Sequence, residues 1–270
     1  MRSDRIIIVR GAGDLATGVI AVLFRSGFGV IALESDEPTC IRRTVSFAQA
    51  LFDEQTEVEG ITAIYAPDRE AALQAVRDDY VPVVIDPDGS LIAEIKPEIV
   101  VDAIIAKRNC GTTMDMAPLV IALGPGFCAG EDCHYVIETQ RGHNLGRIIE
   151  SGPAAPNTGI PGVIAGVGKE RVIHSPADGV FVPVSKIGDS VRAGQTIAQV
   201  GLDRGGAVNV KASIDGCLRG LLHGGLAVRT GMKIADIDPR DDSGYCYSIS
   251  DKARTIAGGV LQLVCAYYTR

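Results

Sequence analysis

The sequence has no tryptophan, and aromatic residues make up only 5% of its 270 residues. It also lacks cation-rich segments, since no run of lysine and arginine exceeds two residues and the formal net charge is −7. Because phosphate backbones are bound by clustered cations, these features argue against nucleic acid as a partner. A membrane-spanning helix needs an apolar run of about 18 residues, and the longest candidate, Val19 to Leu33, is interrupted by Arg25. We therefore expect no membrane partner.

The first residues are not expected to form a secretory signal, because the apolar run after Arg5 is too short for one. The seven cysteines are scattered and odd in number, which favours reduced thiols and a cytoplasmic protein. Apolar residues reach 46%, which excludes global disorder. The 32 glycines have no three-residue period, which excludes collagen.

Strand-like and helix-like segments alternate over residues 1–150. An apolar, β-branched run at Arg5–Val9 precedes a helix-like segment at Leu15–Phe24 and a short strand at Val30–Leu33. A helix over Asp68–Asp79 and further strand-like runs continue the pattern, at residues 61–65, 81–85, 99–106 and 118–123. Strands that alternate with helices predict an α/β domain with a Rossmann-like parallel sheet.

The composition changes at Ser151, where a segment rich in proline and glycine predicts a linker over residues 151–162. The following residues, 163–240, contain an internal repeat. Asp178-Gly179 recurs as Asp215-Gly216, 37 positions later (215 minus 178), and six further glycine or apolar positions between Gly188 and Val200 recur at the same offset. Glycines at fixed spacing between apolar residues predict a small β barrel or sandwich. Residues 241–270 are expected to form a closing helical segment, with a helix over Ser250–Tyr267 that begins at a cap residue, either Ser250 or Asp251.

A possible phosphate-binding loop joins the first strand to the first helix. Gly11-Ala-Gly13-Asp14-Leu-Ala matches the G-x-G-x-x-G/A dinucleotide pattern, and Glu34 ends the second strand, where an acidic residue can accept a ribose hydroxyl. Asp14 leaves an alternative open, because its carboxylate can itself satisfy the helix N-terminus and repel a phosphate.

Ligands of open parallel sheets lie beyond the carboxyl ends of the strands, so the segments that follow strands supply the other candidates. Cations at these places in a net-acidic chain predict an anionic small-molecule ligand. The candidate residues are Arg42, Arg43, Lys107, Thr112, Gly124, Gly126, Arg141, His143 and Asn144. The alternative for each charged residue is a solvated loop position.

A cluster at Cys128, Cys133 and His134 is a candidate zinc site by residue type. Its C-x4-C-H spacing matches no common zinc motif, and isolated cysteines are usually small buried apolar residues, so we expect no metal there. The sequence also offers no nucleophile paired with a base, and whether the protein is an enzyme is left open.

Several longer segments resemble a known family. They are RGAGDLATG from Arg10, IRRTVSFAQA from Ile41, the segment from Lys96 to Phe127, VIETQRGHNLGR from Val136, PNTGIPG from Pro156, KIADIDPRDD from Lys233 and SDKARTIAGGVL from Ser250. Together they resemble the YqeB family of accessory proteins for selenium-dependent molybdenum hydroxylases. The resemblance implies an XdhC-like Rossmann domain that binds molybdenum cofactor or a related nucleotide, and a hydroxylase or its maturation machinery as partner.

The repeat region is similar to biotinyl/lipoyl carrier domains, which places a barrel-sandwich fold after the linker. The carriers hold a lysine in the turn between their two halves, where this chain has Gly205, and Lys211 falls in the following strand. We therefore expect no lipoyl or biotin attachment. Two other functions remain open: an NAD-dependent oxidoreductase, motivated by the GAGDLA loop, and a non-catalytic interaction scaffold. A homo-oligomer is also possible.

Overall fold

The computed structural model describes residues 4–269, whose contacts group into two compact units. The first unit holds the described residues up to Pro38, then Ser46–Thr158 and the described residues from Ile249 onward. The second holds Thr39–Val45 and Gly159–Ser248. The division expected from the sequence is linear, whereas these contacts place a short N-terminal segment in the second unit and the C-terminal helix in the first.

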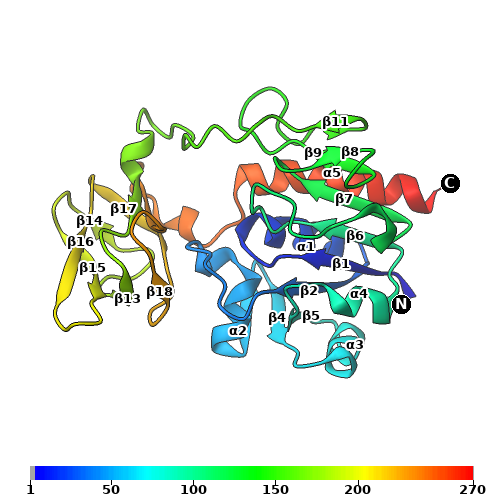
Figure 1. Ribbon diagram of the computed structural model, residues 1–270, viewed down its shortest axis with the longest axis horizontal. Coiled ribbons are helices and arrows are strands. Elements are labelled where there is room, and N and C mark those ends of the chain that lie inside the picture. Colours follow the sequence, from blue (N-terminus) through cyan, green and yellow to red (C-terminus); the bar gives the residue numbers. More distant parts are fainter. Residues whose placement is uncertain (1–3, 270) are drawn as a thin grey trace. The chain divides into compact units, whose positions relative to one another are not determined.

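The first unit is built on one nine-stranded sheet with the order β10-β9-β7-β6-β1-β2-β5-β4-β3 (Figure 1). Its seven central strands, from β9 to β4, are parallel to one another. The two edge strands, β10 and β3, are antiparallel to the strands beside them. The strands are β1 (Ile6–Arg10), β2 (Gly29–Glu34), β3 (Gln55–Val58), β4 (Ile61–Tyr65), β5 (Val81–Ile85), β6 (Ile99–Asp102), β7 (Leu119–Leu123), β9 (Tyr135–Ile137) and β10 (Ile148–Ile149). A separate two-stranded sheet pairs β8 (Cys128–Ala129) with β11 (Gly152–Pro153).

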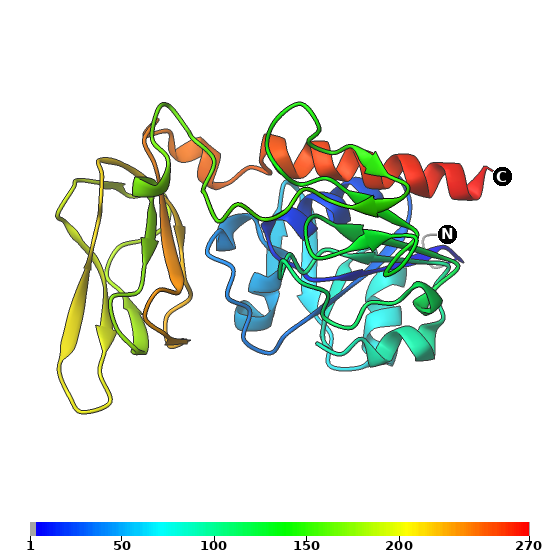
Figure 2. The same cartoon turned by 45° about the horizontal axis from the view of Figure 1, so that its top comes forward.

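Helices cover both faces of the sheet, because successive residues of each buried strand point to opposite sides. On one face, Ile8 and Val100 pack in a cluster with residues of α3 (Arg69–Arg77) and α4 (Ser90–Ile95). On the other face lie α1 (Asp14–Arg25) and α5 (Asp251–Tyr268), which pack along each other (Figure 2). The remaining helix, α2, is a single turn at Ala50–Asp53. No helix in residues 4–269 has the length and apolar character to cross a membrane.

Close approach of α1 and α5 depends on small residues. A Cβ atom added to Gly18 of α1 would lie only 2.7 Å from the Cβ of Ala253 on α5. The N-terminal turn of α5 is fixed by Ser250, whose hydroxyl accepts from the Ala253 amide, as the sequence predicts for a helix cap. The predicted helix at 250–267 is thus confirmed, and it packs on the sheet of the first unit.

The prediction of a Rossmann-like parallel sheet is wrong. The sheet is mixed, and β5 lies between β2 and β4, whereas a Rossmann half-sheet places consecutive strands side by side. In the described segment that runs from β6 through β7 to β9, the connections between the strands contain only a 3-10 turn at Met114–Met116 and the short β8. Apolar runs show where buried strands lie but not their direction or neighbours, which is why the sequence could not predict this order.

The second unit consists of two four-stranded antiparallel sheets, ordered β12-β19-β17-β14 and β16-β15-β13-β18. The strands that form them are β12 (Val172–His174), β13 (Gly179–Pro183), β14 (Ser190–Val191), β15 (Thr196–Gly201), β16 (Ala207–Lys211), β17 (Gly216–Leu221), β18 (Ala227–Val228) and β19 (Lys233–Asp238). Three strands, β13, β14 and β15, start 37 residues before β17, β18 and β19 (216 minus 179, 227 minus 190, 233 minus 196).

The prediction of a biotinyl/lipoyl-like barrel for this region is corrected by these two sheets. Each is an open sheet with two edge strands, and no sheet among the described residues closes on itself. Glycine spacing indicates where short strands turn, as at Gly216, which has a φ of +145° and where an added Cβ atom would lie 2.4 Å from the Asp238 carbonyl oxygen. The same spacing does not distinguish a closed barrel from two separate sheets.

Candidate functional site

The strand order of the first unit changes direction at β1. From β1 the chain passes through α1 to β2 on one side, and it later enters β6 on the other side of β1. The loops that follow β1 and β6 therefore start side by side and continue in opposite directions. In open α/β sheets, this position at the carboxyl edge is where ligands bind.

The loop after β1 lies directly against the loop after β6. Gly11 has a φ of +99°, and a Cβ atom there would lie 2.8 Å from the carbonyl oxygen of Ala103. Gly13 is the extended N-cap residue of α1, and Asp14 is the first residue of the helix. Three predicted residues of the GAGDLA motif thus share one turn, and glycine at position 11 is required both by the backbone conformation and by the space.

The same loop is held by polar groups from two other segments. The Glu34 carboxylate accepts hydrogen bonds from the amides of Ala12 and Ser35, each at 2.8 Å. The Ala12 carbonyl accepts from the Ser46 hydroxyl at 2.8 Å and from the Ala48 amide at 2.9 Å. Glu34, predicted to face a ribose, is therefore engaged in positioning the loop itself.

A buried ion network fixes the base of the loop after β6. Arg10, at the end of β1, is 1% exposed and donates to the Thr112 hydroxyl at 2.5 Å and to the carbonyls of Pro87 and Cys110. The Thr112 hydroxyl donates to the Asp102 carboxylate at 2.6 Å, and that carboxylate lies 3.8 Å from Arg10. Burial raises the pKa of Asp102, although Thr112 and Arg10 oppose this change.

The loop above this network is strained and carries cations. Ile105 and Lys107 have φ values of +59° and +63°, and a β-branched residue in this region is an outlier that costs about 1–3 kcal/mol. Lys107 and Arg108 are both exposed. Gly126, with a φ of +102°, packs so closely that a Cβ atom would lie 2.5 Å from the Arg108 backbone. Residues 105–108 are therefore held in a defined conformation with their charged side chains outward.

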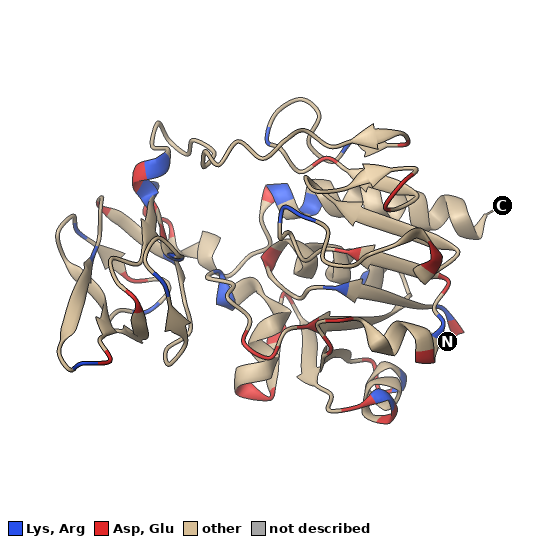
Figure 3. Ribbon diagram, viewed as in Figure 1, with Lys and Arg blue, Asp and Glu red and all other residues tan. Residues whose placement is uncertain are grey.

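A third group of charges lies at the start of α5. Arg141 forms a two-pronged ion pair with Asp251, at 2.9 and 3.1 Å. Beside them, burial and the Arg141 charge lower the pKa of Lys252, while Asp14 and Glu138 act in the opposite direction. Because Asp14 begins α1, this places Lys252 near the loop after β1. Figure 3 shows the basic residues on the loop after β6 and on the first turn of α5.

The other predicted residues occupy three different settings. Gly124 (φ +75°) is packed against the Thr139 side chain, and His143 and Asn144 are exposed in the turn that follows Arg141. The last two, Arg42 and Arg43, belong to the second unit, where they donate to the carbonyls of Tyr245 and Leu221. The prediction that these two arginines contact a ligand at the sheet edge is thus replaced by a role in holding the second unit.

The cysteine and histidine candidates lie around β8. The His134 Nδ1 accepts from the Val120 amide at 3.0 Å, so this nitrogen is engaged by the sheet. Burial raises the pKa of Cys133 to about 12, which keeps the thiol protonated, and metals bind thiolates. Among the residues that the structure describes, no group of three or more metal-binding side chains lies close enough to hold an ion.

Two residues of the site were not predicted. Arg10 is the one charged residue at the end of an apolar strand, a signal that a buried ionic partner exists, but its partners come from distant loops. Lys252 has no local signal, because its position depends on how α5 packs beside α1.

No family model matches the chain. It is 52% identical over 258 residues to "Uncharacterized protein YqeB" of Escherichia coli (strain K12), an alignment that covers 96% of this chain and 47% of that protein. The chain thus spans about half the length of this relative, whose name states no activity.

Solved structures that are similar over most of the chain share little sequence with it. One is a succinylglutamate desuccinylase/aspartoacylase from Rhodobacter sphaeroides, with a TM-score of 0.28, 15% identity and coverage of 86% of this chain and 85% of that one. Another is an aspartoacylase family protein from Mesorhizobium loti, with a TM-score of 0.29, 13% identity and coverage of 86% and 84%. Similarities of this strength assign no activity to the chain.

These comparisons correct the family-based expectations. The relative has no assigned activity, no family model matches, and the solved structures are named for desuccinylases and aspartoacylases instead of XdhC-type chaperones or lipoyl carriers. The prediction of an accessory protein for a selenium-dependent molybdenum hydroxylase, with its XdhC-like domain, is therefore wrong. The two alternatives given with it, an NAD-dependent oxidoreductase and a non-catalytic interaction scaffold, are withdrawn together with that prediction.

Proposed function

We propose that this chain binds a small anionic ligand at the carboxyl edge of the first unit's sheet, and that nucleotides are the first class to test. The observation that supports this most directly is the approach of Gly11 to the Ala103 carbonyl, because it brings two loops together where the strand order reverses. Ligands of open α/β sheets bind at such a position.

The electrostatics around these loops favour an anion. The N-terminus of α1 presents backbone amides and the positive end of the helix dipole. Lys107 and Arg108 add two cations on the strained loop after β6. The chain as a whole has a net charge of −7, so these two cations do not simply reflect an overall excess of positive charge.

Lys252 supports the proposal through its own protonation. Burial disfavours its charged form, and this lowers its pKa. A bound anion stabilises the charged form, so ligand binding and protonation of Lys252 are coupled. Acid–base chemistry by Asp102 does not enter the proposal, because its carboxylate is committed to Thr112 and the Ile104 amide.

The test is equilibrium binding of ADP and pyrophosphate, followed by calorimetry and by ligand-dependent thermal unfolding of the full chain. Lys107→Ala should weaken binding about tenfold, the loss expected for one charge-assisted hydrogen bond. Arg77→Ala is the control. Arg77 is an exposed cation at the end of α3, shortly before β5 begins, so it lies near the amino ends of the parallel strands and away from the proposed site at their carboxyl ends. Equal affinities of the wild type and Lys107→Ala, or no binding by the wild type, would contradict the proposal.

A further inference from the structure

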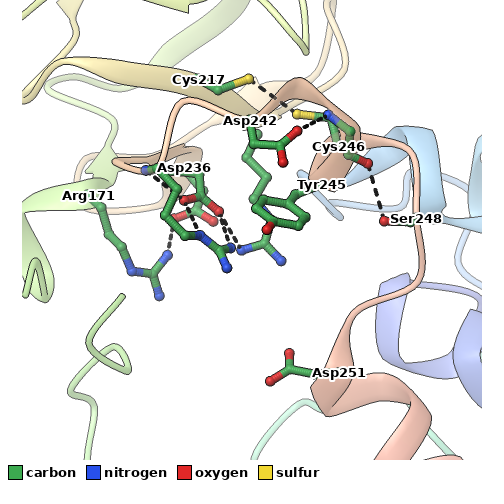
Figure 4. A network of polar contacts seen from close by, with 12 residues as sticks. Arg171, Cys217, Asp236, Asp242, Tyr245, Cys246, Ser248 and Asp251 are labelled. Carbon is green, nitrogen blue, oxygen red and sulfur yellow. Dashed lines mark hydrogen bonds and ion pairs between the residues drawn. The ribbon is translucent and has the colours of Figure 1, made fainter. Parts of the chain in front are cut away.

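The second unit contains a buried cluster of arginines and aspartates that is separate from the proposed ligand site. Its members come from β17, β19, the segment around Arg171 and the residues that follow β19 (Figure 4). Arg171 forms an ion pair with Asp236. Arg240 binds Asp238 with two guanidinium nitrogens, at 2.9 and 2.6 Å, and with its backbone amide at 3.1 Å. Both carboxylates of the cluster are therefore taken by these two arginines.

Arg219 is the exception within this cluster. Its side chain is buried, with 8% of the residue exposed, and among the described residues its one ion pair is a contact of 3.4 Å between Nη1 and Asp238. The Nε atom is fully buried and has no hydrogen-bond partner within residues 4–269. A buried guanidinium donor without a partner is costly, because burial removes the water that would otherwise satisfy it.

The position of Arg219 in its strand explains why it points into the cluster. The pairing of β17 with β19 shifts register between Leu218 and Gly220, so Arg219 is the extra residue of a β-bulge. Bulges re-aim a side chain that would otherwise continue the alternation of the strand. The backbone is thus shaped to place this guanidinium beside a carboxylate that another arginine already neutralises.

A second cation lies near Arg219. Both Arg42 and Arg219 act on the Cys246 thiol electrostatically, and the Cys246 sulfur lies 3.9 Å from the carbonyl of Leu218, the residue before Arg219. Arg42 is also buried, with 8% of the residue exposed, and its Nη2 donates to the Tyr245 carbonyl at 2.8 Å. The segment that carries Arg42 lies against the end of β17, because the Leu221 amide donates to the Ile41 carbonyl at 2.8 Å.

We propose that Arg219 binds a small oxyanion in the second unit, with Arg42 on the adjacent segment as a second cation. A phosphate or carboxylate oxygen satisfies the buried Nε donor and supplies the counter-charge that Asp238 cannot, since Arg240 holds it. Guanidinium groups match such anions because their parallel donors fit two oxygens. This site is independent of the proposed ligand site, which lies in the first unit.

The experiment measures the unfolding temperature of the full chain in inorganic phosphate, in acetate and in chloride, at equal ionic strength. Phosphate or acetate should raise the temperature above that in chloride for the wild type. A response to phosphate alone identifies a phosphate site, and a response to both identifies a general oxyanion site. Arg219→Met should remove the response and weaken the fitted affinity at least about tenfold.

The control variant is Arg192→Met, which removes an 88% exposed arginine side chain from the same unit and should leave the response unchanged. Lys107→Ala separates the two proposals, because it alters the first unit only. A response that disappears in Lys107→Ala but persists in Arg219→Met would overturn this proposal, as would a wild type that responds to no oxyanion. If Arg219→Met does not fold, Arg219→Lys is used instead. Lysine keeps the positive charge but lacks the two parallel guanidinium donors, so it should weaken phosphate binding about tenfold.

Discussion

The substitution Thr112→Val tests whether the buried Arg10 network holds the loop after β6. The Thr112 hydroxyl is fully buried and joins two charged groups, since it accepts from Arg10 at 2.5 Å and donates to Asp102 at 2.6 Å. Valine has nearly the same shape, so the change removes both hydrogen bonds without leaving a cavity. Arg10 and Asp102, 3.8 Å apart, then face a methyl group in place of the hydroxyl.

The expected cost follows from these contacts. Each of the two hydrogen bonds that are lost involves a charged group and contributes about 1.5–3 kcal/mol, while Arg10 and Asp102 both keep their charges. Arg10 keeps its contacts with two backbone carbonyls, which limits the loss. We therefore expect Thr112→Val to lower the free energy of unfolding by about 3–5 kcal/mol.

The assay is urea unfolding followed by far-ultraviolet circular dichroism, because the chain has no tryptophan to report by fluorescence. Thr113→Val is the control, since the exposed Thr113 hydroxyl bonds to the nearby Asp115, and it should change stability by less than about 0.5 kcal/mol. A cost below about 1 kcal/mol for Thr112→Val would show that the network does not support the loop.

Three further predictions concern other parts of the chain. The pKa of Glu59 is lowered: burial raises it, but hydrogen bonds and charges from Ile249, Arg254 and Arg25 outweigh burial. The stabilisation that the ionised Glu59 contributes to the folded state is thus present at pH values above its ordinary pKa of 4.5, and it is lost as the pH falls below that value. Glu59→Gln should cost about 1–3 kcal/mol at pH 7, and acid titration of unfolding should show the difference vanish. Burial raises the pKa of Cys217 to about 12, so iodoacetamide should label the exposed Cys265 first, as read by peptide mass spectrometry, and early labelling of Cys217 would contradict its burial. Gly216→Ala should destabilise the chain by about 2 kcal/mol more than Gly194→Ala in urea unfolding, because an added Cβ meets the Asp238 carbonyl at 2.4 Å whereas Gly194 has open space.

Local patterns were sufficient to predict several elements of the fold. The apolar, β-branched run at the start gave β1, and the capping residue Ser250 gave the start of α5. The GAGDLA motif also located the turn between β1 and α1, because glycine is required where that turn meets another loop.

Features that depend on distant contacts could not be predicted. The direction of β3 and β10 depends on which neighbours they pair with, and apolar content does not reveal this. Arg42 follows a strand of the first unit, yet its segment joins the second unit through contacts with residues about 200 positions away. The position of Lys252 similarly depends on small residues in the packing of α1 against α5.

The most direct test of the ligand site is a two-dimensional NMR titration of the labelled full chain with ADP. If the ligand binds at the carboxyl edge of the sheet, the amide shifts should change first and most at residues 11–14 and 103–109, and they should saturate together. Shift changes confined to other residues, or none at millimolar ADP, would contradict a nucleotide site between the loops that follow β1 and β6.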